Sequence, residues 1–558
     1  MDNYAIADNF SLLAKLMDIH GENTFKSKTY SVASFNIEKL PVQLANTPRE
    51  KLFSIKGIGE SLGRKIIEML DTGELQVLNE YLEKTPAGVV EMLNIKGLGP
   101  KKINTIWKEL EVESIGELLY ACEENRLLLY KGFGEKTQHN IREAIEFYLQ
   151  NKGSYLYAQI DSYALQLHQA LQKQFNEYKI SFTGAFRRQL EVIEELEWCT
   201  TISTEPLKKY FLENNFDAIQ EDSEQIIFKG PENVKLKFYL ATEQEYCKKL
   251  FQTSCSTDFL VGWEKQYSFP EAITQEAEIF SSAGLVEIPP ALRENDVILT
   301  KLKSASLPEL ITEKDITAII HSHSNWSDGS NTIEEMAQEC IRTGYQFLVI
   351  SDHSKSAFYA NGLKEDRIFE QHRYIDELNQ KLKPFRIFKS IECDILNDGS
   401  LDYSNDVLSS FDLVITSVHS NLKMSEDKAM LRLLNAIKNP YTTILGHMTG
   451  RLLLSRNGYP VDHKKIIDAC AENHVAIELN AHPRRLDMDW RWIDYALEKG
   501  VFITIDPDAH SLEGFNDVKY GVLSAQKGGL TKENNLSSFT LQQFEEHLAR
   551  VKKLKGVV

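Results

Sequence analysis

Histidine and carboxylate residues in the C-terminal half are spaced as metal ligands are. His321 and His323 are two residues apart, so in a β-strand both imidazoles project from one face, and Asp508 and His510 repeat this spacing. Asp328 follows the first pair on the next turn. Imidazole and carboxylate ligands without thiolate suit Zn²⁺, Mn²⁺ or Fe²⁺. The spacing predicts a site for divalent metal ions, whose chemistry is the activation of water and phosphate.

Seven apolar runs in this half of the chain end in a polar cluster, and most of these clusters contain a histidine or an aspartate. Apolar strands alternate with helical segments, which is typical of a parallel α/β domain. The runs end at His323, His353, Asp394, Ser420, His447, His482 and His510. A single histidine after a strand is usually structural. Because barrel enzymes build their sites at the carboxyl ends of strands, we expect these repeated residues to meet at one end of the domain.

The N-terminal third contains three copies of a short glycine motif. Each reads apolar-Lys-Gly-apolar-Gly, at residues 55–59, 95–99 and 130–134, and each precedes a helix. This is the helix-hairpin-helix pattern, in which a tight turn points backbone N–H groups at a DNA phosphate without reading the base sequence. The predicted DNA contacts are Gly57, Gly59, Gly97, Gly99, Gly132 and Gly134. One copy would be an ordinary helix cap, but three favour DNA binding.

Length, charge and cysteine content exclude several classes of protein. The chain has 558 residues, of which 42% are hydrophobic, so several folded domains are expected. A net charge of −18 disfavours nonspecific nucleic-acid binding by the whole chain, so DNA contacts must be local. Seven scattered cysteines without CxxC spacing exclude a disulfide framework and a zinc ribbon. With an acidic N-terminal segment and no apolar run of about 20 residues, we expect a cytoplasmic monomer without membrane contact.

Longer motifs resemble one family. Residues 352–354, 391–396, 417–421 and 446–451 are similar to the PHP domain (polymerase and histidinol phosphatase) fused to bacterial X-family DNA polymerases, the PolX type. Residues 21–41 resemble the 8-kDa domain of these polymerase beta relatives. The resemblance implies a multidomain α+β and α/β fold with helical helix-hairpin-helix domains, a palm and thumb, and a distorted seven-stranded (β/α) barrel. The implied domains are 1–80 (8-kDa-like), 81–150 (fingers-like), 151–235 (palm), 236–310 (palm end and thumb) and 315–558 (PHP).

The resemblance also implies a centre of three metal ions in the barrel. Carried over position by position, the ligands are His321, His323, Asp328, His353, Glu392, His419, His447, Asp508 and His510. All nine are present. His482 stands where the fused family usually has asparagine, so its role stays open, and Arg451 is the expected phosphate clamp.

The polymerase motif is altered. Residues 181–198 resemble the palm motif, with Gly184, Arg187 and Arg188 retained. The two metal-binding aspartates of the family correspond to Glu195 and Glu197, and the third carboxylate corresponds to Lys237. Because Mg²⁺ demands near-ideal octahedral geometry, we expect nucleotidyl transfer to be lost. The alternative is that this acidic segment is an ordinary solvated surface.

One lysine matches a family residue with covalent chemistry. In the family, a lysine after the first hairpin forms a Schiff base with the sugar of an abasic site, and Lys65 holds that position. A second family lysine is replaced by Ser61. The alternative reading of Lys65 is a surface lysine that contacts a DNA phosphate.

These features together predict a DNA-repair phosphoesterase. The resemblance implies 3′-5′ exonuclease action, with abasic-site or 3′-phosphate processing as further activities, on gapped, nicked or 3′-ended DNA associated with the nucleoid. Two alternatives are an active gap-filling polymerase with exonuclease activity and a noncatalytic DNA-binding scaffold. The intact ligand set disfavours the scaffold.

Overall fold

The computed structural model describes most of the chain and separates it into two compact units, Met1–Lys152 and Gly153–Val558. The described residues are 1–110, 112–123, 127, 130–150, 153–230, 234–303, 306–357, 360–422, 424–454 and 457–557. Residue 151, where the sequence predicts a domain to begin, lies outside them. None of the described helices has both the length and the apolar surface needed to cross a membrane.

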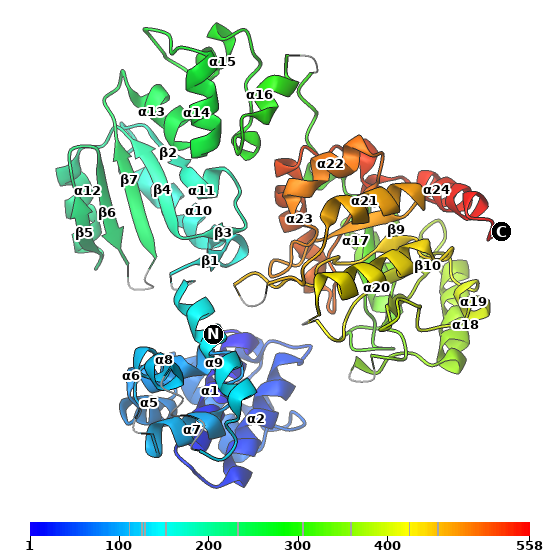
Figure 1. The fold of residues 1–558 in the computed structure, drawn as a ribbon. Coiled ribbons are helices and arrows are strands. Elements are labelled where there is room, and N and C mark those ends of the chain that lie inside the picture. The colour runs from blue at the N-terminus through cyan, green and yellow to red at the C-terminus, as the bar shows by residue number, and fades with distance from the viewer. Residues whose placement is uncertain are drawn as a thin grey trace. The chain divides into compact units, whose positions relative to one another are not determined.

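The first unit is helical in its described residues (Figure 1). Its α-helices are α1 (Asn3–Ile19), α2 (Thr24–Glu38), α3 (Arg49–Leu52), α4 (Glu60–Thr72), α5 (Gln76–Glu83), α6 (Ala87–Glu91), α7 (Pro100–Lys108), α8 (Ile115–Glu123) and α9 (Glu135–Gln150), with short 3₁₀ turns η1 (Leu44–Asn46) and η2 (Met92–Asn94). Their apolar faces form one core, which includes Phe10, Leu13 and Ile66. The three glycine motifs directly precede α4, α7 and α9. The first glycines of the motifs have φ values of 91°, 87° and 96°, a region that favours glycine.

The second unit begins with a mixed five-stranded sheet. Its strands are β2 (Ile180–Thr183), β4 (Glu195–Thr200), β5 (Asp217–Glu221), β6 (Gln225–Lys229) and β7 (Lys235–Leu240), in the order β2-β4-β7-β6-β5. Only β4 and β7 run parallel. A two-stranded ladder joins β1 (Tyr155–Leu156) to β3 (Val192–Ile193). Trp198, Phe211, Phe228 and Phe238 are buried in the core of this palm region.

Helices surround and follow this sheet. They are α10 (Tyr157–Gln174), α11 (Gly184–Arg187), α12 (Thr204–Glu213), α13 (Tyr246–Thr253), α14 (Thr257–Gln266), α15 (Ala277–Ser282), η4 (Pro290–Leu292) and α16 (Val297–Lys301). Phe251, Trp263 and Phe280 form a separate aromatic core in the later, thumb-like part. The palm and thumb regions therefore have their own cores.

The rest of the second unit is built around a ring of parallel strands. The strands are β8 (Ala318–Ser322), β9 (Phe347–Ile350), β10 (Arg386–Lys389), β11 (Glu392–Asp394), β12 (Ile415–Ser417), β13 (Ile444–Leu445), β14 (Ala476–Asn480) and β15 (Ile503–Asp506). They form two sheets, β10-β9-β8 and β11-β12-β13-β14-β15. Bridges from Ser322 of β8 to Ala509, and from His353 after β9 to Glu392 of β11, connect the two sheets. Because β10 and β11 are halves of one bent strand, the described residues give the distorted seven-stranded barrel that was predicted.

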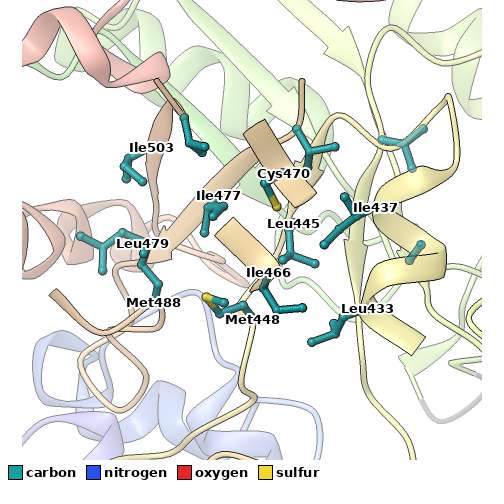
Figure 2. Packing of buried hydrophobic residues seen from close by; sticks show 14 of the residues in the cluster. Leu433, Ile437, Leu445, Met448, Ile466, Cys470, Ile477, Leu479, Met488 and Ile503 are labelled. Carbon is teal, nitrogen blue, oxygen red and sulfur yellow. The ribbon is translucent and has the colours of Figure 1, made fainter. Parts of the chain in front are cut away.

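Helices cover the outside of the barrel. They are α17 (Ile333–Thr343), α18 (Glu365–Lys381), α19 (Asn405–Leu408), α20 (Glu426–Lys438), α21 (His463–Glu472), α22 (Ile493–Glu498), α23 (Val518–Lys527) and α24 (Leu541–Leu554), with 3₁₀ turns η5 (Glu313–Asp315), η7 (Trp490–Trp492), η8 (Glu513–Asp517), η9 (Lys532–Asn534) and η10 (Leu536–Ser538). Figure 2 shows Leu433 and Ile437 of α20 and Ile466 of α21 near Leu445 and Ile477 of the strands. Each buried aliphatic side chain stabilises the fold by about 1.5–3 kcal/mol. This apolar layer fixes the strand ends that carry the polar residues.

Candidate metal centre

The barrel brings all nine predicted ligands to the carboxyl ends of its strands. Among the described residues, four groups of possible ligands each have donor atoms within 4.8 Å of one another, and the groups share members. One consists of His321, Glu478 and Asp506, and the other three contain predicted ligands alone. These three groups are His323, Asp328, His353 and His510; His321, His323 and Asp508; and His353, Glu392 and His419. The ninth residue, His447, joins them because its Nε2 atom lies 2.9 Å from Oε1 of Glu392. The residues predicted from spacing and from the family resemblance therefore form one continuous cluster.

Glu392 lies at the middle of this cluster. Its Oε2 atom is 2.9 Å from Nδ1 of His353, and its Oε1 atom is 3.1 Å from Nε2 of His419. The side chain is 1% exposed, so its charge must be balanced by neighbours rather than by water. Burial opposes ionisation, but the imidazoles of His419 and His321 outweigh it and hold the pKa of Glu392 well below its usual range. Both carboxylate oxygens thus face imidazole nitrogens.

The backbone is strained at two of the ligands. His321 has φ of 57° and Asp508 has φ of 51°, in the left-handed region that non-glycine residues rarely adopt. Such conformations cost on the order of 1–3 kcal/mol each and cluster at functional sites. The strain falls where β8 and β15 end, and Ala509, next to Asp508, bridges back to Ser322. The two strand ends are therefore bent so that both ligand pairs enter the cluster.

The donor atoms fit divalent metal ions. In the part of the chain that the structure describes, His321 Nε2, His323 Nδ1, His447 Nδ1 and Glu392 Oε2 are buried without a hydrogen bond. Buried polar atoms of this kind are costly unless something binds them. Burial, with His510 and His353 nearby, lowers the pKa of His323 to about 3, which favours the neutral ring that binds a metal ion. At His321, His419 and His510 the neighbouring carboxylates outweigh burial and raise the pKa. Nitrogen and carboxylate donors without thiolate match Mn²⁺, Zn²⁺ or Fe²⁺.

Acidic and amide side chains behind the ligands hold several of them in place, and sequence reasoning missed their roles. Nδ1 of His321 lies 2.8 Å from Oε2 of Glu478, and Nδ1 of His419 lies 2.5 Å from Oδ1 of Asp394. Nδ2 of Asn480 donates to Oδ2 of Asp508 over 3.1 Å. Glu478 interrupts the apolar strand β14. An acidic residue inside a fully buried strand is the signal that would have identified it.

The expected phosphate clamp is engaged elsewhere. The guanidinium of Arg451 donates to Asp489 Oδ2 at 2.8 Å, to Glu191 Oε1 at 2.7 Å and to the carbonyl of Arg485 at 2.9 Å. These acceptors use its donors in an ion-pair network between the barrel and the palm region, so the contacts do not support a phosphate-binding role. Arg485 lies nearer the cluster, with Nε 3.6 Å from Oδ2 of Asp508.

His482 belongs to none of the ligand groups found among the described residues. Its Nδ1 atom accepts a hydrogen bond of 3.2 Å from the backbone N–H of Arg484. Burial lowers the pKa of its ring. The structure thus gives His482 a local role in its loop.

The altered palm residues also meet. Strands β4 and β7 place Glu197 opposite Lys237. Nζ of Lys237 lies 3.1 Å from Oε1 of Glu195, and the hydroxyl of Tyr239 donates to Oε1 of Glu197 over 3.1 Å. The backbone N–H of Ala185 donates to the other oxygen of Glu197. The three residues that the resemblance aligns with the polymerase carboxylates are therefore close together, and one of them carries an ammonium group.

The two retained palm arginines are paired with glutamates. Arg187 Nη2 lies 2.6 Å from Glu276 Oε2, and Arg188 Nε lies 3.1 Å from Glu294 Oε1. Arg188 and Glu197 line an open cleft of about 950 Å³.

Lys65 lies in α4, half-buried, after the first glycine motif. Nothing in its contacts distinguishes abasic-site chemistry from phosphate binding.

Comparison with known families and proteins gives consistent matches along the chain. A helix-hairpin-helix domain model matches residues 1–75, a SAM-like helix-hairpin-helix tandem model matches 89–146, and a PHP domain model matches 320–482. The DNA polymerase/3′-5′ exonuclease PolX of Bacillus subtilis is 32% identical over 564 residues, which cover 96% of this chain and 98% of the relative. A probable phosphatase of Caldanaerobacter subterraneus is 30% identical over 171 residues, covering 29% of this chain and 60% of that protein. Another, from a Thermoanaerobacter species, is 26% identical over 253 residues, covering 42% of this chain and 96% of its own.

Proposed function

Because this chain belongs to the PolX family of bacterial DNA polymerase/exonucleases, we propose that its barrel hydrolyses phosphodiester bonds of DNA as a 3′-5′ exonuclease. The observation that carries the proposal is the convergence of nine ligand side chains around the buried carboxylate of Glu392. The PHP domain model matches residues 320–482, and the similarity to probable phosphatases supports phosphoester chemistry.

The side chains of the cluster divide the work between binding and orientation. Divalent ions held here would lower the pKa of water and offset negative charge on a phosphate. His323 keeps a neutral ring, and Glu392 presents both carboxylate oxygens to its imidazole neighbours. Glu478 and Asp394 fix the rings of His321 and His419 by accepting their Nδ1 protons. Ring orientation fixed in this way raises the basicity of ligands and their affinity for metal.

The N-terminal unit supplies the DNA contacts in this proposal. Gly57, Gly97 and Gly132 adopt positive φ in the turns before α4, α7 and α9, as phosphate-binding hairpins require. Backbone contacts of this kind suit gapped, nicked or 3′-ended DNA of any sequence. Abasic-site cleavage through Lys65 and removal of 3′-phosphates are further proposed activities.

We also propose that the palm does not polymerise. A two-metal site needs carboxylates that hold ions about 3.5–4 Å apart. Lys237 places a positive charge against Glu195, and Glu197 is hydrogen-bonded to Tyr239 and to the backbone of Ala185. Glu276 and Glu294 pair with the arginines. Binding of a nucleotide triphosphate would have to break these contacts.

A gap-filling polymerase is the second candidate function. It is favoured by the retained Arg187 and Arg188 and by the open cleft beside Glu197. The noncatalytic scaffold is disfavoured because a scaffold has no use for nine converging ligands.

One assay separates these functions. Labelled gapped and 3′-recessed DNA is incubated with the full-length protein and Mn²⁺, with and without the four deoxynucleoside triphosphates. We expect shortening from the 3′ end in both conditions, and its loss in His353→Ala. Extension that persists in His353→Ala and disappears in Glu195→Ala would establish the polymerase instead. If the metal-loaded wild type neither shortens nor extends the DNA, the noncatalytic scaffold is the remaining function.

A further inference from the structure

An open cleft adjoins the metal centre on the side of His419. Its volume is about 570 Å³. The lining residues include Ser356, Asp394, Asn397, Asp398, His419 and Ser420. Asp394 and His419 connect the cleft to the centre, because they are hydrogen-bonded to each other and His419 also faces Glu392. A ligand in this cleft would therefore touch the site where phosphate binds.

The lining suits a neutral group rather than a second phosphate. It carries two carboxylates, an amide and hydroxyl groups, and no lysine or arginine among its described residues. Carboxylates repel a phosphate, but they accept hydrogen bonds from sugar hydroxyls and from base N–H groups. The volume falls in the roughly 300–1,000 Å³ range of small-ligand pockets. One nucleoside fits such a space.

Asn397 is held in place for a ligand contact. Nδ2 of Asn421 donates to Oδ1 of Asn397 over 2.7 Å. Asn421 has φ of 56°, a conformation that asparagine tolerates better than most residues. In the described part of the chain this bond leaves the Nδ2 donors of Asn397 for a base or sugar oxygen.

Positive charge lies on another side of the cluster. Arg485 approaches Asp508, which follows β15, and the neighbouring Arg484 is exposed. His419 follows β12, and β13 and β14 separate β12 from β15 in the sheet. The arginines and the cleft therefore flank the metal centre on different sides. The arginine side favours the backbone of a DNA strand.

We propose that the cleft binds the unpaired terminal nucleoside of a DNA strand, and that the strand leaves the centre past Arg484 and Arg485. The proposal rests on the phosphodiesterase function above and adds its substrate orientation. Hydrolysis breaks one P–O bond, water supplies the new oxygen on phosphorus and the proton on the leaving alcohol, and no further reactant is needed. The terminal base must separate from its partner before it enters.

Two small esters separate the cleft from the metal centre. Thymidine 5′-(p-nitrophenyl) phosphate carries a nucleoside, bis(p-nitrophenyl) phosphate carries none, and hydrolysis of either releases p-nitrophenol. For the full-length protein with Mn²⁺, we expect Asn397→Ala to raise KM for the thymidine ester about threefold to tenfold, the effect of one lost hydrogen bond. The kcat of this ester and the kinetics of the other ester should not change. Asn397→Trp fills the cleft and should raise KM further.

The control is Asn534→Trp. Asn534 is exposed, and its neighbour Asn535 bridges to Ile503, which lies at the end of β15 opposite to the metal centre. Equal effects of Asn397→Ala on both esters, or none on either, would overturn the subsite. If the wild type hydrolyses neither ester, the phosphodiesterase proposal fails, and calorimetric titration with thymidine 5′-monophosphate decides the subsite. Binding of the monophosphate that is lost in Asn397→Trp and kept in Asn534→Trp supports the subsite. No binding to the wild type, or unchanged binding in Asn397→Trp, refutes it.

Discussion

Nδ1 of His321 lies 2.8 Å from Oε2 of Glu478, and both side chains are fully buried. This contact keeps the proton of the ring on Nδ1 and turns Nε2 toward Glu392 and Asp508, at 3.4 and 3.5 Å. Glu478 therefore acts on the centre through His321, as a positioning residue. Such partners of metal-binding histidines affect metal affinity or activity by about 10–100-fold.

Replacement of Glu478 tests this relationship. We expect Glu478→Ala to weaken Mn²⁺ binding by about 10–100-fold, because the ring of His321 loses its acceptor. Glu478→Gln keeps an acceptor oxygen and should retain most of the affinity. Metal titration by calorimetry measures both, with Glu472→Ala at an exposed position as the control. Wild-type affinity in the alanine variant, with its fold intact by circular dichroism, would contradict the positioning role.

Loss of one ligand should separate catalysis from DNA binding. His353 contacts Glu392 and lies in two of the ligand groups, so we expect His353→Ala to abolish nuclease activity. DNA affinity should stay near the wild-type value, because the hairpin turns belong to the N-terminal unit. Nuclease rates and fluorescence anisotropy check the two parts. The control is His474→Asn, an exposed histidine whose positive φ asparagine tolerates. Parallel loss of activity and binding would contradict the separation.

The hairpin glycines can be tested within one motif. Gly97 has φ of 87°, whereas Gly99 has φ of −84°, and a Cβ at either position meets no atom within 4 Å. Conformation alone therefore distinguishes them. We expect Gly97→Val to distort the turn and weaken binding of any DNA sequence, and Gly99→Ala to have little effect. Anisotropy with two unrelated duplexes measures this. Equal affinity of the two variants would argue against phosphate binding at this turn.

The clustering of candidate ligands was predictable from the sequence because most of them lie at or just after the ends of apolar strands, which the barrel brings together, whereas the full set of nine came from the family resemblance. The contact between His321 and Glu478 was not predictable, because it depends on the fold bringing side chains of β8 and β14 together although they are 157 residues apart in the sequence. The ion pairs of Arg451 were not predictable for the same reason. Its partner Glu191 lies 260 residues away, and only the fold brings an acidic residue to its guanidinium. Spacing along strands identifies which side chains meet, but not which distant partners satisfy them.

The palm gives a graded prediction. We expect no nucleotide incorporation by the wild type, nor by a variant with Glu195→Asp and Glu197→Asp, because Lys237 still repels a second cation. Adding Lys237→Asp removes that charge and should restore measurable incorporation. Each 1.4 kcal/mol of recovered stabilisation gives about a tenfold increase in rate. Primer extension in a His353→Ala background measures this. Incorporation by the otherwise unmodified palm, lost in Glu195→Ala, would show an active polymerase.

Lys527 predicts a pH dependence of stability at the junction of barrel and palm region. Its buried ammonium donates to Oε1 of Glu294 at 2.7 Å and to the carbonyl of Arg188 at 2.8 Å. Burial lowers the pKa of Lys527 to about 8, although the carboxylate of Glu294 opposes the shift. Between this pKa and the ordinary value near 10.4, the unfolded chain binds more protons than the folded one, so stability rises with pH. Relative to Lys527→Met, which does not titrate, the wild type should gain about 2–3 kcal/mol of unfolding free energy between pH 7.5 and 10.5.

Urea unfolding of both proteins at the two pH values measures the difference, and Lys527→Arg, which stays charged, should not show the gain. The same pH dependence in the wild type and in Lys527→Met would refute a depressed pKa for this lysine.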